Sequence, residues 1–174
     1  RQWKRAHPGH RSFAVLRHPL HRAWTAFRQL LSDGQPELRQ LMRTVHRVAL
    51  PPDEALAGLT RQEQVALFAS FLAFLRRNLN GQTTLPTPAA WASQSEVIAG
   101  FTRVATPDML IREDRLAEDL SALCRAAGIA DPGLDRLPAS QMPDFLREPA
   151  LLQAARQAYL RDYIAFGFED GGAA

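Results

Sequence analysis

Residues 13–27 read FAVLRHPLHRAWTAF, and this stretch decides the fold that the sequence predicts. Its first part, within residues 12–17, is a short apolar run ending in an arginine, as in a buried strand of a parallel sheet. Pro19 follows at a position typical of a first helical turn, and apolar residues then recur with helical spacing to about Leu31. The stretch predicts a strand, a turn and a helix, with Arg17 at the carboxyl end of the strand.

One face of this helix carries groups that bind anions. Arg22, Thr25 and Arg28 follow at three-residue spacing, so two guanidiniums and a hydroxyl share that face. In parallel α/β sheets ligands bind beyond the carboxyl ends of strands, where a helix N-terminus offers N–H donors. Arg17 would add a planar guanidinium. The pattern predicts a phosphate-binding turn; the alternative is a strand, turn and helix whose arginines are only solvated.

The rest of the chain is predicted to be mostly helical. Thr60 and Glu63 form a capping-box pattern that opens a helix apolar nearly all round. Further helices are expected at about 36–48, 60–79, 115–127 and 149–166, short strands at 102–105 and 109–112, an irregular loop at 78–89, and turns at 131–133 and 138–143. These elements predict one α/β domain over residues 1–174, predominantly helical with a few short strands.

Length and composition narrow the class of protein. The chain has 174 residues, of which 46% are hydrophobic and 22% charged, so it is expected to fold. Its longest apolar run, residues 65–75, has 11 residues, whereas a membrane span needs about 20. No secretory signal pattern is visible, and a lone Cys124 is expected to be a small core residue. These features favour a cytoplasmic protein without a membrane span.

Charge is distributed unevenly along the sequence. Residues 1–50 hold ten Lys or Arg against two acidic residues, a net +8, whereas residues 51–174 hold 11 against 16, a net −5. The basic part predicts an anionic partner, and a non-catalytic module that binds nucleic acid is the alternative. That alternative is less favoured because the basic residues alternate with core positions. The five histidines lack the spacing and the accompanying Cys or carboxylate of a metal site, so no metal is expected.

Several segments of the chain, in order, resemble the sulfotransferase family. Arg17-His18-Pro19, with Arg22 and with Thr25 eight positions after Arg17, is similar to that family's 3′-phosphate-binding motif. The other matching segments are Trp91-Ala92-Ser93-Gln94, similar to W-x-P-Q; residues 109–120, similar to a strand followed by Glu-x-x-Leu-x-x-Asp-Leu; and residues 159–168, similar to the closing Tyr-x-x-Asp and Phe-Gly patterns. The resemblance spans nearly the whole chain and looks closest to the carbohydrate sulfotransferase branch.

This resemblance implies a P-loop-NTPase-like sulfotransferase fold, incomplete at its N-terminus, and an enzymatic function. The reaction would transfer a sulfuryl group from 3′-phosphoadenosine 5′-phosphosulfate to a hydroxyl of a carbohydrate-type acceptor, without a metal. Arg17 and Thr25 would hold the 3′-phosphate of the donor, and Arg22 would support the turn or the phosphate. Trp91 and Gln94 would contact the acceptor, although Trp91 can equally be a loop anchor.

The sequence also departs from the family pattern. Ala90 replaces a His that often precedes the Trp, and Ser93 replaces the Pro of W-x-P-Q. No G-x-x-x-x-G-K-[ST] loop for the 5′-phosphosulfate occurs in the sequence, so the chain is expected to supply the 3′-phosphate half of the donor site. No catalytic base is assigned. Glu113 is expected to pair with Arg112 or Arg115, and Asp162 to make a helix-surface or packing contact.

Overall fold

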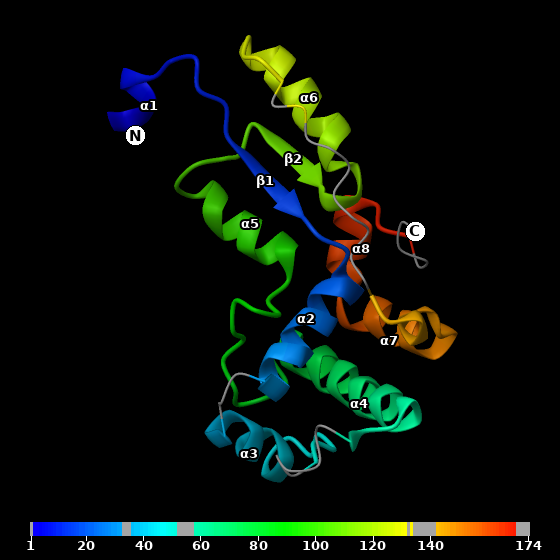
Figure 1. Cartoon of the computed structure of the whole chain (residues 1–174). Helices are drawn as coiled ribbons and strands as arrows, with labels where there is room; N and C mark the ends of the chain where they lie inside the picture. Colours follow the sequence, from blue (N-terminus) through cyan, green and yellow to red (C-terminus); the bar gives the residue numbers. More distant parts are fainter. Residues whose placement is uncertain (1, 33–35, 52–57, 132, 134–141, 170–174) are drawn as a thin grey trace. The chain divides into compact units, whose positions relative to one another are not determined.

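The computed structural model describes residues 2–32, 36–51, 58–131, 133 and 142–169, and it is an α/β structure that is predominantly helical (Figure 1). Its helices are α1 (Gln2–Ala6), α2 (Pro19–Ser32), α3 (Pro36–Thr44), α4 (Arg61–Leu79), α5 (Gln94–Thr102), α6 (Leu116–Ala127), α7 (Pro149–Ala158) and α8 (Leu160–Phe166), with 3₁₀ turns at Glu113–Arg115 and Asp144–Arg147. Its two strands, β1 (Phe13–Leu16) and β2 (Met109–Arg112), form a parallel sheet.

The chain divides into two compact units. The sheet unit comprises Arg1–Arg17 and Glu96–Gln141, and the helical unit comprises His18–Ser95 and Met142–Ala174. Within the described parts of both units, no helix has the length and apolarity needed to cross a membrane.

The sheet unit is organised by the pairing of β1 with β2. The register runs from Phe13 opposite Met109 to Leu16 opposite Arg112. At the start of the pair the Asp108 carboxylate accepts from both the backbone N–H and the hydroxyl of Ser12, at 2.7 and 2.8 Å. Helix α6 packs on β2. The next residues after the last pair are Arg17 on one strand and Glu113 on the other. Because the strands are parallel, both lie at the same edge of the sheet.

The helical unit is built around α4, which packs against α2 and α7. The α4 side chains that are fully excluded from solvent are Phe68, Phe71, Leu72, Phe74 and Leu75. Trp24 and Phe27 of α2 contact the Phe68 ring, with centroids 5.2 and 5.5 Å away. This aromatic core makes α4 the central helix of the helical unit and fixes α2, the helix that the opening sequence stretch predicted.

Two predicted helices are shorter in the structure. The helix expected over 36–48 ends at Thr44, and Val45, expected in its apolar stripe, is 56% exposed. The chain turns there, since the Val48 N–H bonds the Met42 carbonyl at 2.9 Å and Arg47 has a φ of 54°. The helix expected over 149–166 is interrupted at Tyr159, whose ψ is 31°. Tertiary contacts, described below, hold that residue.

The strand expected at 102–105 is wrong. Thr102 ends α5, and the N–H groups of Val104 and Ala105 both bond the Phe101 carbonyl at 2.9 Å in a turn. The β-branched residues of this segment favoured a strand locally. Neither α5 nor α1 was predicted. Most of the turn expected at 138–143 lies outside the described residues.

The capping box of α4 is confirmed, and it gives a testable stability effect. The Glu63 N–H bonds the Thr60 hydroxyl oxygen at 3.3 Å, while the Glu63 carboxylate accepts from the Thr60 N–H at 2.7 Å. We expect Thr60→Ala to lower the free energy of unfolding by about 1 kcal/mol at pH 7, measured by urea denaturation.

The same cap predicts a pH dependence. The hydrogen bonds from the Thr60 side chain and backbone lower the pKa of Glu63 below its ordinary value. A lowered pKa in the folded state means that the stabilisation is present above the ordinary pKa and is lost as pH falls through the lowered one. The difference between parent and Thr60→Ala should therefore shrink on acidification. An equal difference at pH 7 and at a pH low enough to protonate Glu63 in the folded protein would contradict this account.

Candidate functional site

Arg17 lies at the carboxyl end of β1 and is held by a carboxylate from the end of β2. The Glu113 carboxylate accepts from Nε of Arg17 at 2.6 Å and, through its other oxygen, from one terminal nitrogen. This is a bidentate ion pair between residues 96 positions apart in the sequence. The side chains are 39% and 28% exposed, and the hydrogen bond that Arg17 donates to Glu113 raises the pKa of Arg17. The guanidinium is thus oriented and remains reachable from solvent.

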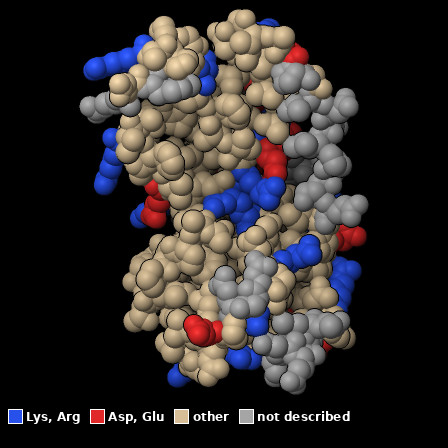
Figure 2. All heavy atoms as spheres, turned by 60° about the vertical axis from the view of Figure 1, so that its left-hand side comes forward, with Lys and Arg blue, Asp and Glu red and all other residues tan. Residues whose placement is uncertain are grey.

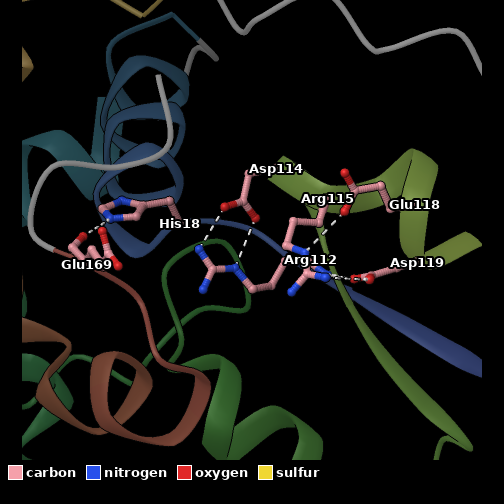
Figure 3. A network of polar contacts seen from close by, with 7 residues as sticks. All are labelled: His18, Arg112, Asp114, Arg115, Glu118, Asp119 and Glu169. Carbon is pink, nitrogen blue, oxygen red and sulfur yellow. Dashed lines mark hydrogen bonds and ion pairs between the residues drawn. The ribbon is translucent and has the colours of Figure 1, made fainter.

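The charged residues at the end of β2 and just after it form separate pairs (Figure 3). Arg112 pairs with Asp114 at 3.0 and 2.7 Å, and Arg115 lies 3.6 Å from Glu118 and 3.8 Å from Asp119. The sequence prediction considered only neighbours of Glu113 and so missed its partner Arg17. Arg17 is likewise paired with a carboxylate, so ion pairing does not distinguish it from Arg112 and Arg115. It is the candidate for binding an anion because of its position at the carboxyl end of β1.

The start of α2 is fixed in the helical unit through His18. Its Nε2 lies 2.9 Å from the Glu169 carbonyl, a contact drawn in Figure 3, and its ring meets Tyr163 and Phe168 edge-on. Its own carbonyl accepts from the Arg22 N–H at 3.1 Å. One turn further, the Thr25 hydroxyl donates to the His21 carbonyl at 3.0 Å. To donate to a phosphate, that hydroxyl would first have to turn away from the helix backbone.

Arg22 has a clear structural role within the helical unit. Its guanidinium donates to the carbonyls of Ala92 at 2.8 Å and Ala89 at 3.2 Å, residues that follow the long loop after α4. The resemblance gave Arg22 two possible roles, support of the turn or of the phosphate. In the structure Arg22 instead holds residues 89–92, a segment that neither of these roles involves.

Trp91 is a loop anchor. The indole is 3% exposed, and its N–H donates to the Asn78 side chain at 2.9 Å. The same asparagine, at the end of α4, also binds Thr83, Leu85 and Thr87. The alternative that the sequence left open for Trp91 is therefore the one that the structure displays. Gln94 is also buried, at 7% exposed, and contact of Trp91 and Gln94 with an acceptor stays a prediction.

Asp162 is the buried acceptor that holds the segment after Trp91. This side chain is 0% exposed, and it accepts from the Ser93 hydroxyl at 2.6 Å and from the N–H groups of Gln94 and Ser95 at 2.8 and 2.9 Å. It thereby caps the N-terminus of α5. Of the two roles expected for Asp162, the packing contact is confirmed and the surface contact is wrong.

Tyr159 completes the attachment of the same segment. Its hydroxyl donates to the Trp91 carbonyl at 2.9 Å, and burial raises the pKa of this hydroxyl, so it stays a neutral donor. Residues 89–95 are consequently held from α2 by Arg22 and from the 159–162 region by Tyr159 and Asp162. Three of the segments that carry the family resemblance thus meet in the helical unit.

Comparisons of this chain with known proteins identify no relative. No protein-family model matches the chain, and no match was found among curated proteins or solved structures. Among the described residues, no group of three or more His, Cys, Asp or Glu side chains is placed to hold a metal ion. On the face shown in Figure 2, the described Lys and Arg side chains lie in separate groups, with acidic side chains beside some of them.

Proposed function

We propose that this chain binds the 3′-phosphate of 3′-phosphoadenosine 5′-phosphosulfate as part of a sulfotransferase that acts on hydroxyls of carbohydrate-type acceptors. The observation that carries the proposal is the position of Arg17. It follows the last paired residue of a parallel strand and comes two residues before the first residue of α2. Ligands of parallel α/β sheets bind at this edge, and guanidiniums recognise phosphate by paired N–H bonds.

The state of the Arg17 side chain fits this role. A guanidinium has five N–H donors, so its engagement with the Glu113 carboxylate is compatible with binding an anion as well. The side chain is 39% exposed, which lets a phosphate reach it. The resemblance, and not the geometry, adds the Thr25 hydroxyl to the same phosphate.

The contacts of the 89–95 segment support the family proposal independently of Arg17. Arg22, Trp91 and Asp162 belong to three segments that resemble sulfotransferases, and each has a defined contact in the helical unit. Hydrogen bonds from Arg22 to the Ala92 carbonyl, from Tyr159 to the Trp91 carbonyl and from Ser93 to Asp162 bring these three segments together in one compact unit. We propose on this basis that the fold is the P-loop-NTPase-like fold of that family.

The chemistry proposed is in-line transfer of a sulfuryl group, with positive groups stabilising the charge on the transferred group. Arg17 and Thr25 address the end of the donor that does not react. They would supply affinity and register, and their binding energy would position the phosphosulfate for groups that act on it. No catalytic base is assigned among the described residues.

A nucleotide titration tests the proposal. We expect adenosine 3′,5′-bisphosphate to bind the chain at least about tenfold more tightly than adenosine 5′-monophosphate, because a charge-assisted hydrogen bond contributes about 1.5–3 kcal/mol. Isothermal titration calorimetry at 0.15 M salt measures both affinities. Equal affinities would refute the proposal. Duplex DNA serves as a third probe, since a nucleic-acid-binding module would bind it with a steep salt dependence and show no preference between the nucleotides.

A further inference from the structure

The Arg17–Glu113 pair has a geometry that constrains how Arg17 can meet a ligand. Glu113 takes Nε and one terminal nitrogen of the guanidinium, which fixes the plane of the group as well as its position. Arginine side chains otherwise sample many rotamers. The partner is itself placed by the fold, because Glu113 directly follows β2 in the register Leu16 opposite Arg112.

We infer that Glu113 is a positioning residue for nucleotide binding, which presents the Arg17 guanidinium to the 3′-phosphate in one orientation. This inference rests on the proposed function of Arg17 and gives Glu113 a role that the sequence did not indicate. Holding a side chain in its binding orientation before the ligand arrives removes an entropic cost from binding. Glu113 does not touch the nucleotide in this scheme and acts only through Arg17.

The Glu113 carboxylate also repels a phosphate, and this repulsion opposes the gain from orienting Arg17. The two anionic groups would lie on different edges of the same guanidinium, and both Arg17 and Glu113 are partly exposed to water. Solvent around these partly exposed groups reduces the repulsion, and salt at 0.15 M reduces it further. Salt also weakens the Arg17–Glu113 ion pair, but the two hydrogen bonds of the pair still fix the orientation of the guanidinium. We therefore expect the loss of Glu113 to weaken recognition of the 3′-phosphate.

The test measures the ratio of affinities for adenosine 3′,5′-bisphosphate and adenosine 5′-monophosphate in 0.15 M salt. In Glu113→Ala this preference should fall roughly two- to tenfold, the effect of releasing one immobilised side chain. Glu113→Gln can still accept one hydrogen bond and should lose less. Glu118→Gln, which changes an exposed carboxylate paired with Arg115, is the matched control and should keep the parent ratio. A ratio of two affinities is unaffected by the fraction of protein that is folded.

A double variant shows whether Glu113 acts through Arg17 or acts directly on the nucleotide. In the Arg17→Ala background, Glu113→Ala should cause no further change in the ratio. An unchanged or increased preference in Glu113→Ala, with Arg17→Ala still abolishing it, would overturn the positioning role and leave the proposed function standing. A parent chain without any preference would overturn both.

Discussion

Asp162→Ala is expected to lower the free energy of unfolding by about 3–5 kcal/mol, the largest stability effect that the structure predicts. The substitution removes a fully buried acceptor from two backbone N–H groups and from the Ser93 hydroxyl, which keeps the Ser95 hydroxyl as a partner at 2.7 Å. Each buried donor without a partner costs about 1–3 kcal/mol. The start of α5 would lose its cap, and the segment after Trp91 would lose one of its attachments.

Urea denaturation followed by circular dichroism measures this effect. Asp162→Asn keeps one acceptor oxygen and should fall between the parent and Asp162→Ala. Glu118→Ala, at an exposed position on α6, is the control and should change stability by no more than about 0.5 kcal/mol. A loss below about 1 kcal/mol in Asp162→Ala would show that the three hydrogen bonds contribute little to the fold.

Helices and strands with a strong local pattern were predictable from the sequence. The capping box and nearly continuous apolar run of α4 define it almost to the residue, and the strand-turn-helix order of β1 and α2 is likewise local. Helix α5 could not be found in this way, because its cap is a carboxylate 67 to 69 positions away. The break at Tyr159 has the same origin, since its hydroxyl binds a carbonyl 68 positions away.

In the candidate site, too, features set by neighbouring residues were predictable, whereas contacts between residues far apart in the sequence were not. The position of Arg17 after a strand was predictable, because the apolar run and the proline on either side of it are adjacent in sequence. Its pairing with Glu113 was not, since it depends on the register of β1 against β2. The sequence predicted an ion pair of Glu113 with Arg112 or Arg115, because both are close to it in the sequence. In the structure Arg112 pairs with Asp114, and Arg115 pairs with Glu118. Long-range contacts that orient a side chain leave little trace in local patterns.

Arg17→Ala should abolish the preference for adenosine 3′,5′-bisphosphate over adenosine 5′-monophosphate, a loss of at least about tenfold in the affinity ratio. The two nucleotides differ only in the 3′-phosphate, so the ratio isolates the interactions of that group. Arg17→Lys keeps the charge but lacks the planar pair of donors, and it should retain a minor part of the preference. Thr25→Val, which removes one hydroxyl, should reduce the preference less than Arg17→Ala.

The control for this series is Arg61→Ala. Arg61 is 67% exposed in its side chain and lies 3.7 Å from Glu148, so it matches Arg17 in being an exposed arginine with a carboxylate partner. Specific recognition by Arg17 predicts that Arg61→Ala keeps the parent ratio. Nonspecific attraction of anions predicts instead that both variants lose affinity for both nucleotides by similar small amounts, with a salt slope reduced by about one in each. Equal behaviour of Arg17→Ala and Arg61→Ala would therefore remove the 3′-phosphate role from Arg17, and with it the observation on which the sulfotransferase proposal depends.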